Sequence, residues 1–462
     1  MISHKKVLLI NPPETEQGNF SGPPLGLLYL AGSLLKENID VEIIDGCLNG
    51  WKKIKQKIGT YKPDIIGITC LTPGRKKALK VAEIAKKINK NILVIMGGVH
   101  PTIMYRQLLE NYPFVDICAL GEGEQTLLEI VKGKDLLEIN GIAFKKGKEI
   151  LLTSPRKYVE NLDEIPFPAW HLIDLQKYSA RGKEVFNGVN LSQEPRISVI
   201  FSRGCVGRCS FCSTWWIWRG WRHRSAKNMV DELEMLNGKF RISHFCFSDD
   251  TLTVDRQATL DLCDEIINRG LKIAFHITTR VDCVDEEMLN KLRKAGCYNV
   301  AYGIETASSR LLEEMGKRID VETSKRAINL TKKSGIEVTV LLIAGNVGEN
   351  IETVNQTIDF LKEVQVQSDE IGSVGGLWIL PGTKLYFECK KAGFINDDFW
   401  LSNKPYKVYT LEHSKLTLKI FDYAYRTKNK LSKWEIINFV KFIPYFIKTM
   451  GGSLKETLKL FS

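Results

Sequence analysis

Short apolar runs alternate with longer amphipathic stretches through the first third of the chain. The amphipathic stretches, such as LGLLYLAGSLLKEN and RKKALKVAEIAKKIN, repeat apolar residues at helical spacing. Runs that are apolar on both faces indicate parallel strands covered by helices on each side. The predicted strands are KVLLIN, VEIID, DIIGITC, ILVIMGG and DICAL. Residues 1–140 are therefore expected to form an α/β, doubly wound, Rossmann-like domain.

Glycine-rich loops follow three of these predicted strands. They read CLTPG (Cys70–Gly74), GGVHPT (Gly97–Thr102) and GEGE (Gly121–Glu124). Ligands of doubly wound domains bind beyond the carboxyl ends of the strands, and glycine lets the backbone approach a bulky ligand closely. The loops also fit ordinary turns, and Glu122 and Glu124 also fit the start of a helix, where the helix dipole favours acidic residues.

A second strand and helix alternation begins after a polar, proline-containing connector, which we place in residues 141–190. It predicts a partial barrel of six βα units over residues 191–392, related to the eight-unit TIM barrel. The strand candidates are RISVIFS, HFCFSDD, KIAFHITTR, NVAYGIE, EVTVLLIAG and EIGSVGGLWILPG. Residues 393–462 are expected to form a small, mostly helical C-terminal region.

Polar residues follow successive strands of the predicted barrel, where they share the face that carries chemistry in such folds. Arg203 and a cysteine-rich loop follow the first strand, and the later strands are followed by Asp249, Asp250, Thr279, Arg280, Glu305 and Gly345. We therefore expect these segments to converge on one site.

The cysteine loop reads RGCVGRCSFC and spaces Cys205, Cys209 and Cys212 as CxxxCxxC. A structural zinc site normally has four protein ligands, and the spacing of His223 does not recommend it as the fourth. Iron–sulfur clusters also take cysteine thiolates, ordinarily four. Three thiolates leave one iron of a cubane cluster open to an outside ligand, so we expect a [4Fe-4S] cluster, with zinc as the alternative.

With this loop ahead of a barrel, the chain resembles the radical S-adenosylmethionine (SAM) superfamily. FSDDTLT, TTRVDCVDEEMLNKLRKAGC, YGIETASSRLLEEMGK and LLIAGNVGEN are similar to the signatures of its cobalamin-dependent subgroup. The N-terminal NPP, PPLGLLYLAG, GGVHPT and GEGE stretches and the LDEIPFPAW connector extend the resemblance over about residues 5–390.

The resemblance implies roles for the residues after the strands. SAM would bind the open iron, with Asp249 and Asp250 near its amino group, Arg280 near its carboxylate, Glu305 near its ribose and Gly345 near its adenine. Glu305 also fits a structural ion pair, and either aspartate fits a helix cap. The chain departs from the subgroup at GNVGEN, which usually reads like GLPGET, and at GIET, which usually reads GIES.

The resemblance also implies a cobalamin site at the first domain. No DxHxxG motif supplies a lower axial histidine, and the subgroup generally binds cobalamin without one. The alternative is a nucleotide-type domain that holds no cobalamin. The residues expected to line the cobalamin site are Leu71, Thr72, Gly97, Gly98, His100, Gly121, Glu122 and Gly123.

The activity that the resemblance favours is methylation of an unactivated carbon. A 5′-deoxyadenosyl radical from SAM would remove a hydrogen atom, and methylcobalamin would supply the methyl group. One alternative is a cyclase of the anaerobic magnesium-protoporphyrin IX monomethyl ester type, without methyl transfer. Another is a sensor that binds the cluster or cobalamin without turnover.

Composition limits the partners and the location. The formal charge of +11 comes without a nucleic-acid-binding motif, so we expect no nucleic acid. Eleven cysteines and an N-terminus without a signal peptide favour a reducing cytoplasm. We expect a small-molecule substrate, aromatic or lipid-like, and an acidic flavodoxin- or ferredoxin-type reductant. Basic and apolar residues interleave near the C-terminus in runs too short to span a bilayer, which allows peripheral membrane contact.

Overall fold

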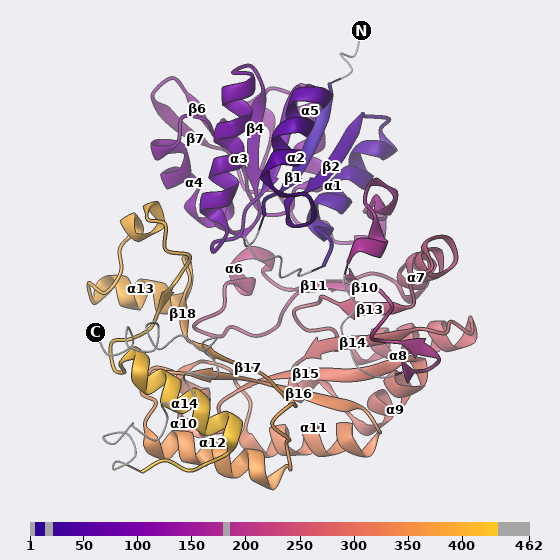
Figure 1. The fold of residues 1–462 in the computed structure, drawn as a ribbon, viewed down its shortest axis with the longest axis vertical. Helices are drawn as coiled ribbons and strands as arrows, with labels where there is room; N and C mark the ends of the chain where they lie inside the picture. Colours follow the sequence, from indigo (N-terminus) through magenta and orange to yellow (C-terminus); the bar gives the residue numbers. More distant parts are fainter. Residues whose placement is uncertain (1–4, 14–21, 179–184, 433–462) are drawn as a thin grey trace.

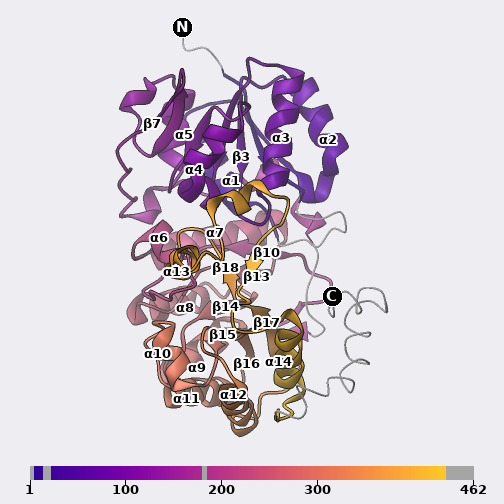
Figure 2. The same cartoon turned by 90° about the vertical axis from the view of Figure 1, so that its left-hand side faces the viewer.

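The computed structural model describes residues 5–13, 22–178 and 185–432. Two β-sheets with their helices lie one above the other along the long axis of the molecule, the N-terminal sheet at the top of Figure 1. The C-terminal region runs alongside both, as the turned view in Figure 2 shows.

The N-terminal sheet has the strand order β2-β1-β3-β4-β5-β6-β7. Its first five strands are parallel, and alternate residues of β1 pack against opposite helical layers: Val7 and Leu9 face α1 and α5, and Leu8 and Ile10 face α2, α3 and α4. The doubly wound prediction is therefore confirmed. The elements are β1 (Val7–Asn11), α1 (Leu25–Lys36), β2 (Val41–Asp45), α2 (Gly46–Tyr61), β3 (Ile65–Thr69), α3 (Arg75–Ile88), β4 (Leu93–Gly97), α4 (Val99–Asn111), β5 (Ile117–Ala119) and α5 (Glu124–Val131).

Two antiparallel strands, β6 (Ile142–Lys146) and β7 (Glu149–Leu152), extend this sheet beyond β5. They lie in the stretch GIAFKKGKEILL, within the predicted connector. The sheet thus continues past the predicted boundary at residue 140. The reason is that Ile142 and Phe144 are apolar enough to pack against the core beside Ile117.

The second sheet is a curved half-barrel of six parallel strands in the order β10-β13-β14-β15-β16-β17. Phe245, Phe275, Val300 and Val338 point outward into the core under the helices. Four of these helices begin after an Asp or Asn whose side chain accepts a backbone N–H, as capping residues do: Asp255, Asp285, Asp320 and Asn350. This confirms the partial barrel.

The elements of the half-barrel follow one another as strand and helix. They are β10 (Arg196–Val199), α7 (Ala226–Phe240), β13 (His244–Phe247), α8 (Arg256–Asn268), β14 (Ala274–Thr279), α9 (Glu286–Ala295), β15 (Cys297–Glu305), α10 (Ser309–Glu314), α11 (Val321–Lys333), β16 (Glu337–Ala344), α12 (Ile351–Glu363) and β17 (Ile371–Gly376).

The chain from β18 onward contacts both domains. β18 (Trp378–Ile379) and α13 (Lys384–Lys391) contribute to a core cluster that includes Met104 of α4, and β19 (Lys407–Val408) pairs with β18. In contrast, α14 (Lys415–Thr427) packs on α12, β16 and β17. The last part of the basic stretch, residues 433–462, lies outside the described residues. Among the helices that are described, none has the length and apolar character to cross a membrane.

Candidate cluster and cofactor sites

A two-stranded ribbon carries the cysteine loop. β11 (Ser202–Gly204) pairs with β12 (Trp221–His223), and the loop with the short helix α6 (Thr214–Trp218) lies between them. A Cβ on Gly204 would lie 1.9 Å from the carbonyl oxygen of Gly220, and its φ is +98°, so only glycine fits where the ribbon closes. Asp249 supports the ribbon because its Oδ1 accepts the backbone N–H and the hydroxyl of Ser202, each at 2.5 Å.

The three cysteines are half-buried free thiols. A Cβ on Gly207 would lie 3.4 Å from Cys205 Sγ and 3.7 Å from Cys209 Sγ, so both thiols border the same glycine. Burial raises the pKa of the Cys209 and Cys212 thiols, while Lys317 and Arg280 act to lower that of Cys209. Thiolate binding therefore has nearby cations to offset the loss of solvation.

The triad fits an iron–sulfur cluster better than a zinc ion. In the part of the chain that is described, no three Cys, His, Asp or Glu side chains gather around a point suited to a single metal ion. His223 is engaged elsewhere: its Nδ1 donates to the carbonyl of Arg224 at 2.8 Å, and its ring stacks on Trp221. Three thiols on one loop are the donor set for a cluster with one open iron.

Two of the predicted SAM-binding residues lie beside this loop. Arg280 forms a fork with Asp282, with nitrogen–oxygen distances of 2.9 and 2.8 Å, and a Cβ on Gly207 would lie 3.0 Å from its Nη1. Asp250 is exposed and accepts the hydroxyl of Thr214 at 3.1 Å. A guanidinium and a carboxylate thus stand ready at the cysteine loop for an amino-acid ligand.

The other three have protein partners. Asp249 is buried on the ribbon, and burial raises its pKa to about 7. Glu305 has φ of +64° and pairs with Lys317 at 2.8 Å, which is the ion pair that the sequence left open as an alternative. A Cβ on Gly345 would lie 2.3 Å from Leu418 of α14, so this helix covers the loop expected to meet adenine. The SAM roles of all five residues stay predictions.

A cavity of about 780 Å³ opens where the order of the N-terminal sheet reverses, between β1 and β3. Open α/β sheets bind ligands at this switch point. Asn11, Pro12 and Pro13 of the NPP stretch line it together with Thr69, Leu71 and Gly74. Leu71 is 51% exposed, which leaves an apolar side chain free for a large ligand. Among the predicted cobalamin residues, Leu71 is the one that lines this cavity.

His100 lies in the first turn of α4. It is fully buried, its Nδ1 is 3.3 Å from Thr72 Oγ1, and its Nε2 has no hydrogen-bond partner in the described chain. Burial lowers its pKa to about 3, so the ring is neutral. Gly98 precedes α4 and has a φ of +101°. A Cβ on Gly98 would lie 3.1 Å from the carbonyl oxygen of Cys70, so glycine lets these two segments approach closely.

Arg75, which sequence reasoning missed, fastens the C-terminal region over this edge. Its guanidinium is buried and donates to the carbonyls of Trp400, Ser402, Lys404 and Pro405 at 2.6 to 3.1 Å. Asn403 and Pro405 consequently line the 780 Å³ cavity. Nothing local in the sequence indicates this contact, because Trp400 lies 325 residues away.

The GEGE loop faces the cysteine ribbon. Glu122 and Glu124 bind Arg203 through Nη1 and Nη2 at 2.9 and 2.6 Å, and Glu122 also binds Arg222 at 3.0 Å. Gly121 and Glu122 also line a second cavity of about 570 Å³, together with Thr102 and with Phe387 of α13. Gly123 packs against Leu30, so the predicted residues divide between ligand-facing and structural positions.

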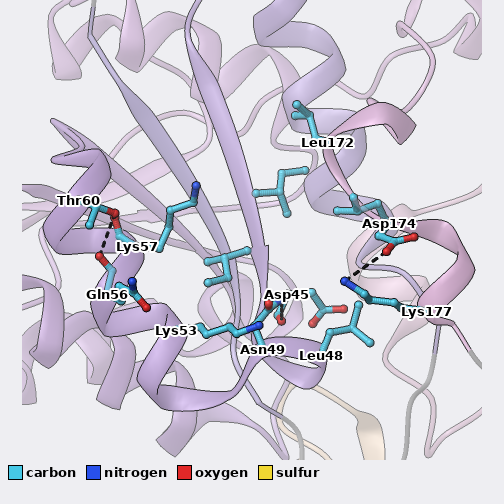
Figure 3. Close-up of a pocket in the computed structure, with 13 residues that line it drawn as sticks. Asp45, Leu48, Asn49, Lys53, Gln56, Lys57, Thr60, Leu172, Asp174 and Lys177 are labelled. Atoms are coloured by element: carbon cyan, nitrogen blue, oxygen red, sulfur yellow. Dashed lines mark hydrogen bonds and ion pairs between the residues drawn. The ribbon is translucent and has the colours of Figure 1, made fainter.

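A third cavity, of about 400 Å³, lies at the outer edge of the sheet, between β2, α2 and residues 172–177 (Figure 3). Its lysines Lys57 and Lys177 pair with Glu42 and Asp174. No residue of the cysteine loop or of the three glycine-rich loops lines it. We therefore do not assign it to the cofactors.

Comparison with known proteins agrees with this geometry. Residues 199–361 match the radical SAM superfamily, and residues 17–131 match the B12 binding domain. The chain is 36% identical over 393 residues to an uncharacterized methyltransferase of Pyrococcus horikoshii, covering 82% of each protein. It is 35% identical to the anaerobic magnesium-protoporphyrin IX monomethyl ester cyclase of Rubrivivax gelatinosus, covering 78% of this chain and 66% of that protein.

Solved structures share the fold. The cobalamin-dependent SAM radical enzyme OxsB, with aqua-cobalamin and SAM bound, superposes with a TM-score of 0.74 at 20% identity, covering all of this chain and 70% of OxsB. The radical SAM methyltransferase TsrM from Kitasatospora setae gives 0.69 at 21% identity, covering 84% of this chain and 76% of TsrM. Together with the identity and coverage of the Pyrococcus relative, these matches show that the chain belongs to the cobalamin-dependent radical SAM enzymes.

Proposed function

We propose that the protein is a methyltransferase that moves a methyl group from cobalamin to an unactivated carbon of a small molecule. The observation that carries this proposal is the docking of the GEGE loop of the cobalamin-type domain on the ribbon of the cysteine loop. Methyl transfer needs both cofactors at one interface. Similar proteins named as methylating enzymes, among them a hopanoid C-3 methylase at 23% identity, support the same activity.

The chain offers a set of groups for each cofactor. Cys205, Cys209 and Cys212 would hold the cluster, and the cavity at the β1/β3 switch point would hold cobalamin against Leu71. When bound, the cluster supplies an electron for cleavage of SAM, and cobalamin supplies the methyl group. Arg280 would orient the SAM carboxylate, and Asp250 would accept from its ammonium group.

Finer features of the proposal concern partners. A substrate with an aromatic or lipid-like part suits the exposed apolar Leu71 and Phe387 at the two cavities. An acidic flavodoxin- or ferredoxin-type reductant suits the formal charge of +11. We also propose a cytoplasmic location, with peripheral membrane contact through the basic C-terminal stretch.

The test is anaerobic reconstitution with iron, sulfide and cobalamin, followed by reaction with SAM and a low-potential reductant and mass spectrometry of the products. We expect both 5′-deoxyadenosine and S-adenosylhomocysteine, and no 5′-deoxyadenosine from Cys212→Ala. 5′-Deoxyadenosine without S-adenosylhomocysteine would replace the proposal by cyclisation, which the 35% identity to the cyclase favours as second candidate. Neither product from fully loaded protein would indicate a sensor.

A further inference from the structure

Four charged side chains join the two halves of the molecule, and we call them the interdomain joint: Glu122, Glu124, Arg203 and Arg222. Arg203 bridges the two glutamates, and Glu122 bridges the two arginines. Glu122 also accepts the backbone N–H of Val159 at 2.8 Å, so the connector is tied to the same carboxylate. Two positive and two negative charges thus form one neutral network.

The interdomain joint is shielded from water. Its side chains are only 4% to 12% exposed. The Arg203 guanidinium lies 5.3 Å from the Tyr29 ring centroid and 5.7 Å from that of Trp218, and Arg222 lies 5.0 Å from Tyr158. Burial by itself raises the pKa of Glu124, but Arg203 brings it below the usual value. A buried, fully paired network of this kind resists separation far more than an exposed pair.

The position of the two arginines connects the interdomain joint to the cysteines. Arg203 and Arg222 stand opposite each other in the register of β11 and β12. The chain enters the cysteine loop through Arg203, two residues before Cys205, and leaves it through Arg222. Both ends of the loop are therefore fastened to one carboxylate of the other domain. A shift of the GEGE loop must move the base of the cysteine loop with it.

We propose that the interdomain joint sets the spacing and orientation of the cluster site relative to the cobalamin site, with its four side chains as positioning residues. This inference rests on the binding of both cofactors and not on methyl transfer. It assigns to Glu122 a task different from the cobalamin contact predicted from sequence, because both of its carboxylate oxygens accept from protein groups.

The test compares wild-type protein with Glu122→Gln/Glu124→Gln, which keeps the shape of the side chains and removes their charge. The matched control is Glu232→Gln, because Glu232 is fully buried, pairs with Arg224 and accepts from Trp170 Nε1 at 2.9 Å, but touches neither loop. All three proteins are loaded with iron, sulfide and cobalamin, and metal and cobalamin contents are measured first.

The first readout is electron paramagnetic resonance of the reduced protein, in which cob(II)alamin and the reduced cluster are both paramagnetic. Their magnetic coupling depends steeply on their separation, so we expect it to change in the double variant and to stay at the wild-type value in Glu232→Gln. Unchanged coupling in the loaded double variant would overturn the inference. This readout is independent of methyl transfer, so a failed proposed function leaves it intact.

The second readout is the ratio of S-adenosylhomocysteine to 5′-deoxyadenosine. A displacement of about 1 Å between reacting groups costs up to about 100-fold in rate, so we expect this ratio to fall about tenfold or more in the double variant. If the double variant does not fold, Glu122→Gln serves in its place, because it removes the charge that bridges both arginines and keeps the pair of Glu124 with Arg203. A wild-type spectrum from that loaded single variant, with unchanged exchange of amide hydrogens at residues 203–212, would equally contradict the proposal.

Discussion

The GEGE loop and the cysteine loop meet at one interface, yet their polar side chains differ in how strongly the protein itself pairs them. Both carboxylate oxygens of Glu122 accept from arginines or from the backbone. The cysteine thiols, in contrast, form no disulfide, and the sulfur of Cys205 makes weak hydrogen bonds with Thr251 Oγ1 and the Gly207 N–H. Fully paired charges of this kind hold the fold, whereas thiols in weak hydrogen bonds remain available to a ligand.

Two arginines repeat the contrast. Arg75 donates hydrogen bonds to carbonyl oxygens, four of which belong to residues 400–405. Arg280 forms a fork with Asp282 and reaches the Lys317 carbonyl, but its Nη1 has no hydrogen-bond partner among the described residues and lies next to Gly207. Arg75 is therefore expected to act on structure and Arg280 on a ligand, and substitutions can separate these tasks.

The largest effect is expected from Cys212→Ala. Loss of one of three thiolates should remove the cluster and reduce 5′-deoxyadenosine formation more than about 1,000-fold, because the activation barrier is no longer lowered. Iron analysis and product quantification measure it. Cys283→Ala is the matched control, since this half-buried cysteine lies outside the triad. Full iron content in Cys212→Ala would contradict the assignment of the triad.

Arg75→Gln should give the next largest effect. Removing the charge leaves several carbonyls of residues 400–405 unpaired, at a cost of about 3 kcal/mol. Amide hydrogens in this segment should exchange faster, and cobalamin should dissociate more readily, as hydrogen-exchange mass spectrometry and absorbance titration would record. Arg256→Gln serves as control because its ion pairs with Asp285 and Glu287 are exposed, where such pairs contribute little. Equal changes in amide exchange and cobalamin dissociation in both variants would contradict a specific structural role of Arg75.

Arg280→Lys should reduce SAM affinity by about 10- to 50-fold, since lysine keeps the charge and loses the fork that pairs with a carboxylate. The measurement is equilibrium binding of SAM to cluster-loaded protein. Thermal stability should stay near the wild-type value, in contrast to Arg75→Gln. Wild-type affinity would show that Arg280 serves the fold through Asp282 alone.

Glu349→Gln should change the pH dependence of stability. Burial raises the pKa of Glu349 to about 7, although Tyr425 and the backbone of Gly345 donate to it. Between about pH 4.5 and 7 the unfolded chain has already released this proton while the folded chain keeps it, so wild-type stability falls as pH rises, by about 3 kcal/mol in total. Thermal unfolding between pH 5 and 8 should show a flatter profile in the variant. An unaltered pH dependence of stability in the variant would show that Glu349 does not cause it.

Local patterns predicted most of the fold and the class of cofactors. Period and composition indicated the five parallel strands and the six barrel strands, and CxxxCxxC indicated the cluster loop, because these signals lie within short stretches. The antiparallel pair β6 and β7 was missed, since KKGK interrupts its apolar residues. GEGE was recognised as a motif, but its partners were not.

The missed contacts are pairings between distant residues. Glu122 and Arg203 lie 81 residues apart, and a carboxylate in a glycine-rich loop looks the same in sequence whether it meets a ligand or an arginine. Glu305 with Lys317, and Gly345 under Leu418, raise the same difficulty for the predicted SAM contacts. Residue type and spacing specify what a side chain can bind. Only the folded arrangement specifies which partner it contacts.

The ribbon of β11 and β12 has a consequence for the order of assembly. During synthesis the N-terminal sheet, Glu122 and Glu124 leave the ribosome before Arg203, and the ribbon closes only once Trp221–His223 have followed. The strands from β13 onward are made later still. The three cysteines therefore emerge together, on a loop whose two ends pair, before the residues expected around SAM that follow β14, β15 and β16.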